Sequence, residues 1–162
     1  MTSPTTAVIE PVVREITVAA PRDRAFDTFI NMTAWWPLDT HTIGKAPARA
    51  SIIQTRVGGR WYGIDADGDS HEIGHVLVFD PPSRLVLSWE ITHDFTYDPS
   101  IRSEVEITFE EVSPAITRVI LEHRKLEVYG EHAAMAREIF NSEGGWGMLL
   151  QRFAAFAEKA AD

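Results

Sequence analysis

The chain of 162 residues contains no cysteine, so it can form neither a disulfide bond nor a catalytic thiol. Basic residues are few: 15 Lys and Arg stand against 24 Asp and Glu, which gives a net charge of -9. Because nothing basic clusters along the chain, we expect neither nucleic acid nor a membrane as a partner. No apolar run approaches the roughly 18 residues of a membrane helix, and residues 1–11 do not resemble a secretion signal. These absences predict a soluble, cytoplasmic protein.

The length and the composition predict one globular domain with a core of its own. We expect residues 1–12 to form a flexible N-terminal tail and residues 13–162 to form that single domain. Aromatic residues make up 10% of the chain and include five tryptophans. This content is typical of a protein with much aromatic surface in its interior.

Residues 142–160 predict a long C-terminal helix, because apolar residues recur there at steps of three and four. In this prediction Ser142 caps the first turn, and three glycines (Gly144, Gly145 and Gly147) lie in the first turns. Each glycine costs a helix about 1 kcal/mol relative to alanine. Their missing side chains therefore indicate that backbone or a ligand comes close to the start of this helix.

Alternating polar and apolar residues predict a strand at residues 14–19 and five or six further strands between residues 50 and 126. Helical patterns cover residues 22–32 and 131–140. Neither a single amphipathic helix nor a one-sided sheet can bury its apolar face alone. We therefore predict an α+β helix-grip fold, in which a curved antiparallel sheet wraps around the long C-terminal helix and two short helices follow the first strand. Such a grip is expected to leave an apolar cavity at its open end.

Two motifs imitate metal sites. Residues 71–75 spell His-Glu-x-x-His, the zinc-protease signature, which requires a helix. The flanking residues favour a strand, on which His71 and His75 would lie about 13 Å apart. Asp65-Ala-Asp-Gly-Asp69 resembles a calcium loop but lacks the glutamate at the twelfth position and is better interpreted as a hairpin turn. No metal and no cofactor are expected.

The predicted lining of the cavity combines large rings with one polar anchor. His123 follows Val119 and Leu121 on an inward face, where a histidine is more often a core residue than a ligand contact or general base. The tryptophans allow the same two interpretations, core packing or pocket wall. The candidate ligand-binding residues are Trp35, Trp36, Trp61, Trp89, Phe109, His123 and Trp146.

Eight short motifs, taken together and in order, resemble the family of activator of heat-shock-protein-90 ATPase homologue-like proteins, within the SRPBCC (START-like, helix-grip) superfamily. The resemblance runs from about Val13 to the C-terminus. The motifs are APRDRAF at 20–26, WWP at 35–37, VGGRW at 57–61, GHVL at 74–77, PPSRLVLSW at 81–89, SEVEI at 103–107, TRVILEH at 117–123 and GGW at 144–146. The resemblance implies a deep hydrophobic cavity between the sheet and the long helix. The superfamily includes lipid and hormone binders, polyketide cyclases and aromatases, and co-chaperone domains.

The leading functional hypothesis is a binder of a small apolar or aromatic molecule, without an assigned catalytic step. The first alternative is a cyclase- or aromatase-type enzyme in which His123 acts as general acid or base. The second alternative is a protein-interaction module of co-chaperone type. Whether the protein forms a homodimer stays open.

Overall fold

The computed structural model describes residues 9–41 and 47–160. Seven strands form one antiparallel sheet in the order β1-β7-β6-β5-β4-β3-β2. The strands are β1 (Val12–Val18), β2 (Ala48–Ile53), β3 (Arg60–Asp65), β4 (Ser70–Asp80), β5 (Arg84–Trp89), β6 (Ser103–Ser113) and β7 (Ile116–Arg124). The helices are α1 (Arg22–Ile30), α2 (Ala133–Phe140) and α3 (Trp146–Ala160), with 3₁₀ turns η1 (Met32–Ala34) and η2 (Leu126–His132). In this described part of the chain no helix has both the length and the apolar character needed to cross a membrane.

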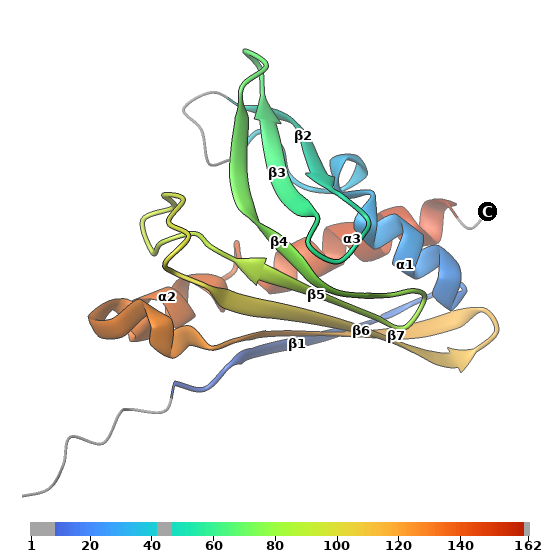
Figure 1. Ribbon diagram of the computed structural model, residues 1–162. Coiled ribbons are helices and arrows are strands. Elements are labelled where there is room, and N and C mark those ends of the chain that lie inside the picture. Colours follow the sequence, from blue (N-terminus) through green and yellow to red (C-terminus); the bar gives the residue numbers. More distant parts are fainter. Residues whose placement is uncertain (1–8, 42–46, 161–162) are drawn as a thin grey trace, which may run out of the picture.

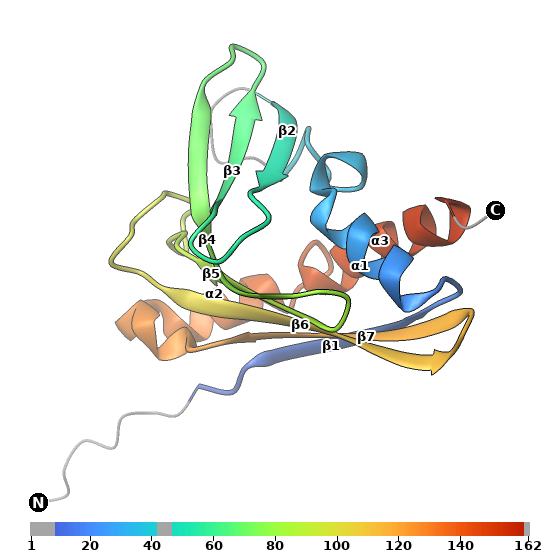
Figure 2. The ribbon, with the colours of Figure 1, turned by 45° about the vertical axis from the view of Figure 1, so that its right-hand side comes forward.

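The sheet is strongly curved, and α3 runs along its concave side (Figure 1). Turning the molecule shows that β2, β3 and β4 rise steeply from the flatter half of the sheet formed by β5, β6, β7 and β1 (Figure 2). The predicted helix-grip fold is therefore confirmed, and α1 and η1 are the two short helices after the first strand. β1 begins at Val12, which pairs with His123 of β7. The predicted tail lies outside the described residues as far as residue 8.

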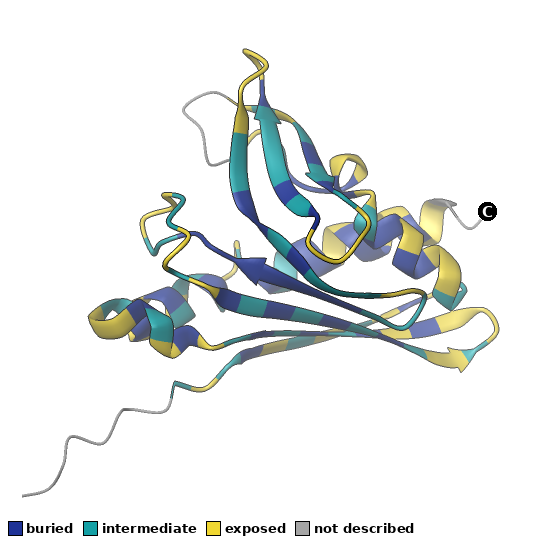
Figure 3. Cartoon of the chain, viewed as in Figure 1, coloured by how far each residue is buried: buried dark blue, intermediate teal, exposed yellow. Residues whose placement is uncertain are grey.

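The hairpin strands β6 and β7 show why one face of the sheet is apolar. Along β6 the buried residues alternate with more exposed ones, and Val105, Ile107 and Phe109 all point into the core. On β7 the buried set includes Val119, Leu121 and His123. The resulting bands of buried and exposed residues are visible along both strands (Figure 3). A period of two places every second side chain against the helix layer.

One end of the space between sheet and helices is filled by aromatic rings. Phe29 of α1 packs against Phe153 of α3 with ring centroids 5.3 Å apart, and Trp35 lies 5.7 Å from the same ring. Phe26 meets Phe109 of β6 at 5.1 Å. Most of these pairs are edge-to-face, an arrangement that aromatic quadrupoles favour. This end of the grip is therefore a packed core.

The long helix begins later than its periodicity predicts. α3 starts at Trp146, so Gly144 and Gly145 precede it and Ser142 does not cap it. The Ser142 hydroxyl instead donates to the carbonyl of Ile139, at the end of α2, over 2.6 Å. The expected close approach does occur: a Cβ on Gly145 would lie 2.1 Å from the carbonyl oxygen of Phe140. The missing side chain thus lets α2 and α3 join through a tight turn.

Candidate functional site

A cavity of about 310 Å³ lies between the sheet and the N-terminal half of α3. Trp146 and Leu149 of that helix face it, while β2, β3, β4 and the residue that ends β5 form the opposite wall. Its aromatic lining consists of Trp36, Trp89, Phe95, Phe140 and Trp146. The volume falls within the range of about 300–1,000 Å³ that is typical of small-molecule sites. The packed rings around Phe153 occupy the other end of the grip, so the hollow is confined to one end.

The structure divides the seven residues predicted to line the cavity. Trp36, Trp89 and Trp146 belong to its wall, whereas Trp35, Trp61, Phe109 and His123 do not. Trp35 and Phe109 are part of the packed aromatic end. Trp61 is fully buried, and its ring contacts the cavity-lining Trp36 and Trp89 at centroid distances of 6.1 and 5.6 Å. Trp61 therefore packs behind the residues that line the cavity.

His123 lies behind the cavity wall in a closed hydrogen-bond chain. The indole Nε1 of Trp146 donates to its Nδ1 over 3.0 Å. Nε2 therefore carries the proton and donates to the Ser103 hydroxyl at 2.8 Å, which in turn donates to the carbonyl of Trp89 at 3.0 Å. The imidazole also stacks on Phe140 at 4.4 Å. Both ring nitrogens have partners within the protein.

This environment does not favour His123 as the anchor of a ligand in this cavity. Complete burial lowers the pKa of the imidazole to about 3, so the ring is neutral at physiological pH. Its one lone pair already accepts the Trp146 indole proton. His123 acts on the cavity only by orienting Trp146, and the geometry gives no support to its use as a general base.

The polar part of the cavity wall is a carboxylate–imidazole pair at the hairpin between β3 and β4. His71 Nε2 lies 2.7 Å from Asp65 Oδ2, and both residues line the cavity. The other oxygen of Asp65 accepts the backbone N–H groups of Asp67 and Asp69, at 2.9 and 3.0 Å. The hydrogen bond from His71 lowers the pKa of Asp65 against the opposing effect of burial, so the carboxyl group is ionised.

The hairpin explains both motifs that resemble metal sites. Residues 66–69 form the predicted turn, with Gly68 at a φ of +89°, and β4 carries both His71 and His75 as a strand. His71 turns to Asp65 of the same hairpin, while His75 Nδ1 lies 2.9 Å from a carboxylate oxygen of Glu90. Within the described ranges, no three acidic or histidine side chains gather closely enough to hold a metal ion.

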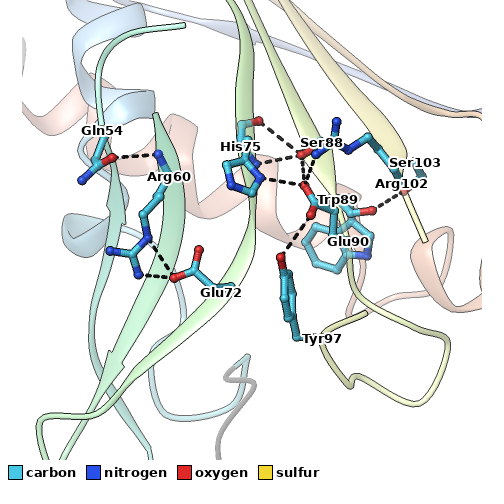
Figure 4. Close-up of polar contacts among 10 residues, drawn as sticks. All are labelled: Gln54, Arg60, Glu72, His75, Ser88, Trp89, Glu90, Tyr97, Arg102 and Ser103. Atoms are coloured by element: carbon cyan, nitrogen blue, oxygen red, sulfur yellow. Dashed lines mark hydrogen bonds and ion pairs between the residues drawn. The ribbon is translucent and has the colours of Figure 1, made fainter. Parts of the chain in front are cut away.

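Glu90 is a buried carboxylate that was not predicted. It is inaccessible to solvent yet contacts His75, Ser88, Tyr97 and Arg102, which surround it in Figure 4. Burial alone would raise the pKa of Glu90, but hydrogen bonds from Ser88 and His75 outweigh burial and lower it. The carboxylate is therefore charged, with the Arg102 guanidinium 3.5 Å away.

The Glu90 cluster fastens a segment that contributes to the cavity wall. Residues 91–102 leave β5, and Tyr97 returns to donate to Glu90 over 3.2 Å and to bridge Ile91. At the tip of this segment, Phe95 lines the cavity with a φ of +63°. A bulky residue rarely adopts this left-handed backbone, and such strain persists only where the surroundings enforce it. The pairing around Glu90 thus positions Phe95.

Several lining residues carry no periodic signal. Phe95, Phe140, His41 and the Asp65–His71 pair reach the cavity from turns and element ends rather than from the middle of a strand or helix. The alternation that finds inward residues does not extend into turns. The hairpin turn predicted near residues 65–69 was the one sequence signal that could have brought Asp65 and His71 together, because a tight turn places its two ends side by side.

The comparisons place this architecture among known proteins. Residues 19–158 match the family described as Activator of Hsp90 ATPase homolog 1-like protein. An anthrahydroquino-γ-pyrone synthase, Txn09, is 32% identical over 91% of this chain and 97% of its own, with a TM-score of 0.63. CalC from Micromonospora echinospora, a self-sacrificing resistance protein, is 31% identical over 94% of this chain and 96% of its own, with a TM-score of 0.70.

A third structure shares the fold alone: an Hsp90 activator from Plasmodium falciparum, 16% identical over 72% of this chain and 73% of its own, with a TM-score of 0.51. The comparison with curated proteins gives no match. The family match covers most of the chain and agrees with the resemblance drawn from its motifs. The chain belongs to the family of Activator of Hsp90 ATPase homolog 1-like proteins.

Proposed function

We propose that the protein binds a compact aromatic small molecule in the cavity beneath the N-terminal half of α3. The observation that carries the proposal is the wall itself: five aromatic rings surround about 310 Å³, with few polar groups. Flat rings can stack or pack edge-on against such walls. A volume at the lower end of the usual range favours a compact ring system over a long acyl chain.

The relatives support binding as the property to test first. A synthase and a resistance protein, each more than 30% identical to this chain, share its fold while their names denote different activities. Occupancy of the cavity by a small molecule is a property that both activities can share. The co-chaperone alternative has weaker support, because the Hsp90 activator resembles this chain in fold alone.

A binding titration with a cavity-filling variant tests the proposal. Flavone, a planar aromatic ketone without a hydroxyl group, is titrated while the fluorescence of the five tryptophans is followed. We expect saturable quenching, because three indoles line the cavity. Ala50→Phe places a ring in the cavity wall and should abolish the quenching. Ala134→Phe, at an exposed position of α2, is the matched control and should bind as the unmodified protein does.

The outcomes separate clearly. Loss of quenching in the Ala50 variant alone supports binding in this cavity. Quenching that survives Ala50→Phe, or an absence of saturable binding by flavone, naphthalene and anthraquinone, contradicts the proposal.

A second candidate function is ring closure on the bound molecule, favoured by the 32% identity to a pyrone synthase. A direct test is incubation with 2′-hydroxychalcone, whose phenol oxygen can add to its own conjugated alkene to give flavanone without a change in mass. Chromatography distinguishes the two isomers. If the protein accelerates the reaction and Ala50→Phe abolishes that acceleration, an enzyme is favoured. If the chalcone binds but reacts no faster than in buffer, a binding protein is favoured.

A further inference from the structure

We propose that the Asp65–His71 pair accepts the proton of a phenolic hydroxyl, so that the cavity takes hydroxylated aromatic molecules and holds them as phenolates. The inference rests on the proposed binding function and names the chemical class of its ligand. Asp65 and His71 both line the cavity, and the imidazole is partly exposed there, whereas the Asp65 side chain is nearly buried.

The geometry leaves one nitrogen of His71 available. Nε2 lies 2.7 Å from an ionised carboxylate oxygen of Asp65, so it must carry a hydrogen and donate it. Among the residues that the structure describes, no group forms a hydrogen bond with Nδ1 of His71. In a neutral imidazole, a carboxylate that fixes one nitrogen as a donor leaves the other as a proton acceptor, as in the Asp–His arrangement of serine hydrolases.

The other polar side chains of the wall are already engaged. His41 is 2.8 Å from the Gly144 carbonyl through Nε2 and 2.9 Å from the Thr40 hydroxyl through Nδ1. The Ser51 hydroxyl lies 3.4 Å from the indole nitrogen of Trp61 and 3.7 Å from the sulfur of Met32. His71 is thus the lining histidine whose ring keeps a vacant nitrogen within the described residues.

The transfer is a balanced acid–base step. The phenol O–H bond breaks, an N–H bond forms at Nδ1 of His71, and nothing is oxidised or reduced. The resulting imidazolium lies between the Asp65 carboxylate and the phenolate, so each negative charge faces the positive ring. Without that proton, a phenolate beside Asp65 would be repelled, as it would by Asp67 and Asp69 of the same turn. An aromatic wall and one such pair together suit a flat ring that carries an acidic hydroxyl.

7-Hydroxyflavone tests the inference because its absorption shifts to longer wavelength when its hydroxyl ionises. The protein is mixed with it at about pH 7, where the free compound is largely neutral and an ordinary imidazole is largely unprotonated and able to take up a proton. We expect the bound molecule to show the spectrum that the free compound has in alkali. His71→Gln should abolish the shift, because an amide cannot take up the proton. Asp65→Asn should weaken it, since Asp65 acts as a positioning residue through His71.

The controls separate a lost proton acceptor from a lost fold. Flavone has no hydroxyl to ionise, so saturable flavone binding by the His71 and Asp65 variants should persist and would show that their cavity is still formed. His132→Gln alters a histidine at the end of η2, outside the cavity lining and the Glu90 cluster, and should keep the shift.

Three results overturn the inference while leaving the proposed function intact. They are flavone binding without 7-hydroxyflavone binding, 7-hydroxyflavone bound with the spectrum of its neutral form, and a shift that persists in His71→Gln. Failure of flavone, naphthalene, anthraquinone and 7-hydroxyflavone alike to bind overturns the proposed function itself.

Discussion

The indole Nε1 of Trp146 donates a hydrogen bond of 3.0 Å to Nδ1 of His123, joining the first residue of α3 to the inner face of β7. The bond links the two layers of the grip at the place where the cavity separates them. It also sets the indole as a wall of the cavity, with the imidazole behind it. A contact between core and cavity of this kind makes the stability of the fold and the shape of the site interdependent.

Trp146→Phe should destabilise the protein more than Trp89→Phe does. Both substitutions replace an indole of the cavity wall with a smaller phenyl ring. Only the first removes a hydrogen-bonded N–H group, since the buried Nε1 of Trp89 has no partner among the described residues. Leaving His123 Nδ1 unpaired should add about 1–3 kcal/mol to the cost. Urea denaturation of both variants measures the difference. Equal losses would mean that the Trp146–His123 bond contributes nothing net.

Acidification should destabilise the fold through His123. The pKa of this histidine is about 3 in the folded protein against 6.5 for an unperturbed histidine, so the unfolded chain binds the proton first as the pH falls. Stability that is complete above pH 6.5 is therefore lost progressively toward pH 3. At about 1.36 kcal/mol per pKa unit, the loss amounts to at most about 5 kcal/mol.

The measurement is the free energy of unfolding from urea titrations across this pH range. His123→Leu should be less stable than the unmodified protein at pH 7 but should show a flatter pH profile. His132→Gln, in a less buried position, is the histidine control and should keep the original slope. A His123→Leu profile as steep as that of the unmodified protein would contradict the assignment.

The layers of the fold could be predicted from the sequence because they follow from periodicity. The alternation along β6 and the three- and four-residue steps of α3 each define one apolar face, and two such faces must meet. Periodicity does not say how far along the grip a side chain lies. Trp35 and Trp36 are adjacent in the chain, yet the first packs against Phe153 in the filled end and the second lines the cavity.

The positions of the polar residues in the site depend on contacts between segments that are distant in the chain. Local sequence patterns do not predict such contacts. Asp65 and His71 each attracted attention within a motif that resembled a metal site, and neither motif described the pair that they form. His123 points inward as its alternation predicts, but its neighbours Trp146 and Ser103 come from two other elements. Whether an inward histidine faces a hollow or a ring is decided by that packing.

Glu90→Gln should be among the more destabilising single changes outside the apolar core. The substitution removes a buried charge that contacts four side chains, including the 2.9 Å contact with His75. Disrupting a buried charged network of this kind costs about 2–4 kcal/mol. Because the pKa of Glu90 is lowered, its contribution is present above its usual pKa and disappears as the pH falls through the folded value.

Glu72→Gln is the matched control for this change. Glu72 pairs with Arg60 in the same view (Figure 4), but the two side chains are 27% and 41% exposed, so the pair is screened by solvent and should contribute little to stability. Chemical denaturation gives both costs, and hydrogen exchange should show faster opening of residues 91–102 in the Glu90 variant alone. Similar costs for the two variants would mean that the buried carboxylate does not hold the segment.

Gly145→Ala should disrupt the turn between α2 and α3, whereas Gly144→Ala should be tolerated. An added Cβ at residue 145 would lie 2.1 Å from the carbonyl oxygen of Phe140, which is backbone and cannot rotate away. Relieving that overlap requires α3 to shift, at a cost of about 1–3 kcal/mol. At residue 144 no atom lies within 4 Å of the added carbon. Gly144, Gly145 and Trp146 all line the cavity, but only the first variant should displace Trp146, so flavone binding should weaken more in that variant than in the second. Thermal melts and the fluorescence titration check both effects, and equal behaviour of the two variants would show that the backbone of α2 can yield.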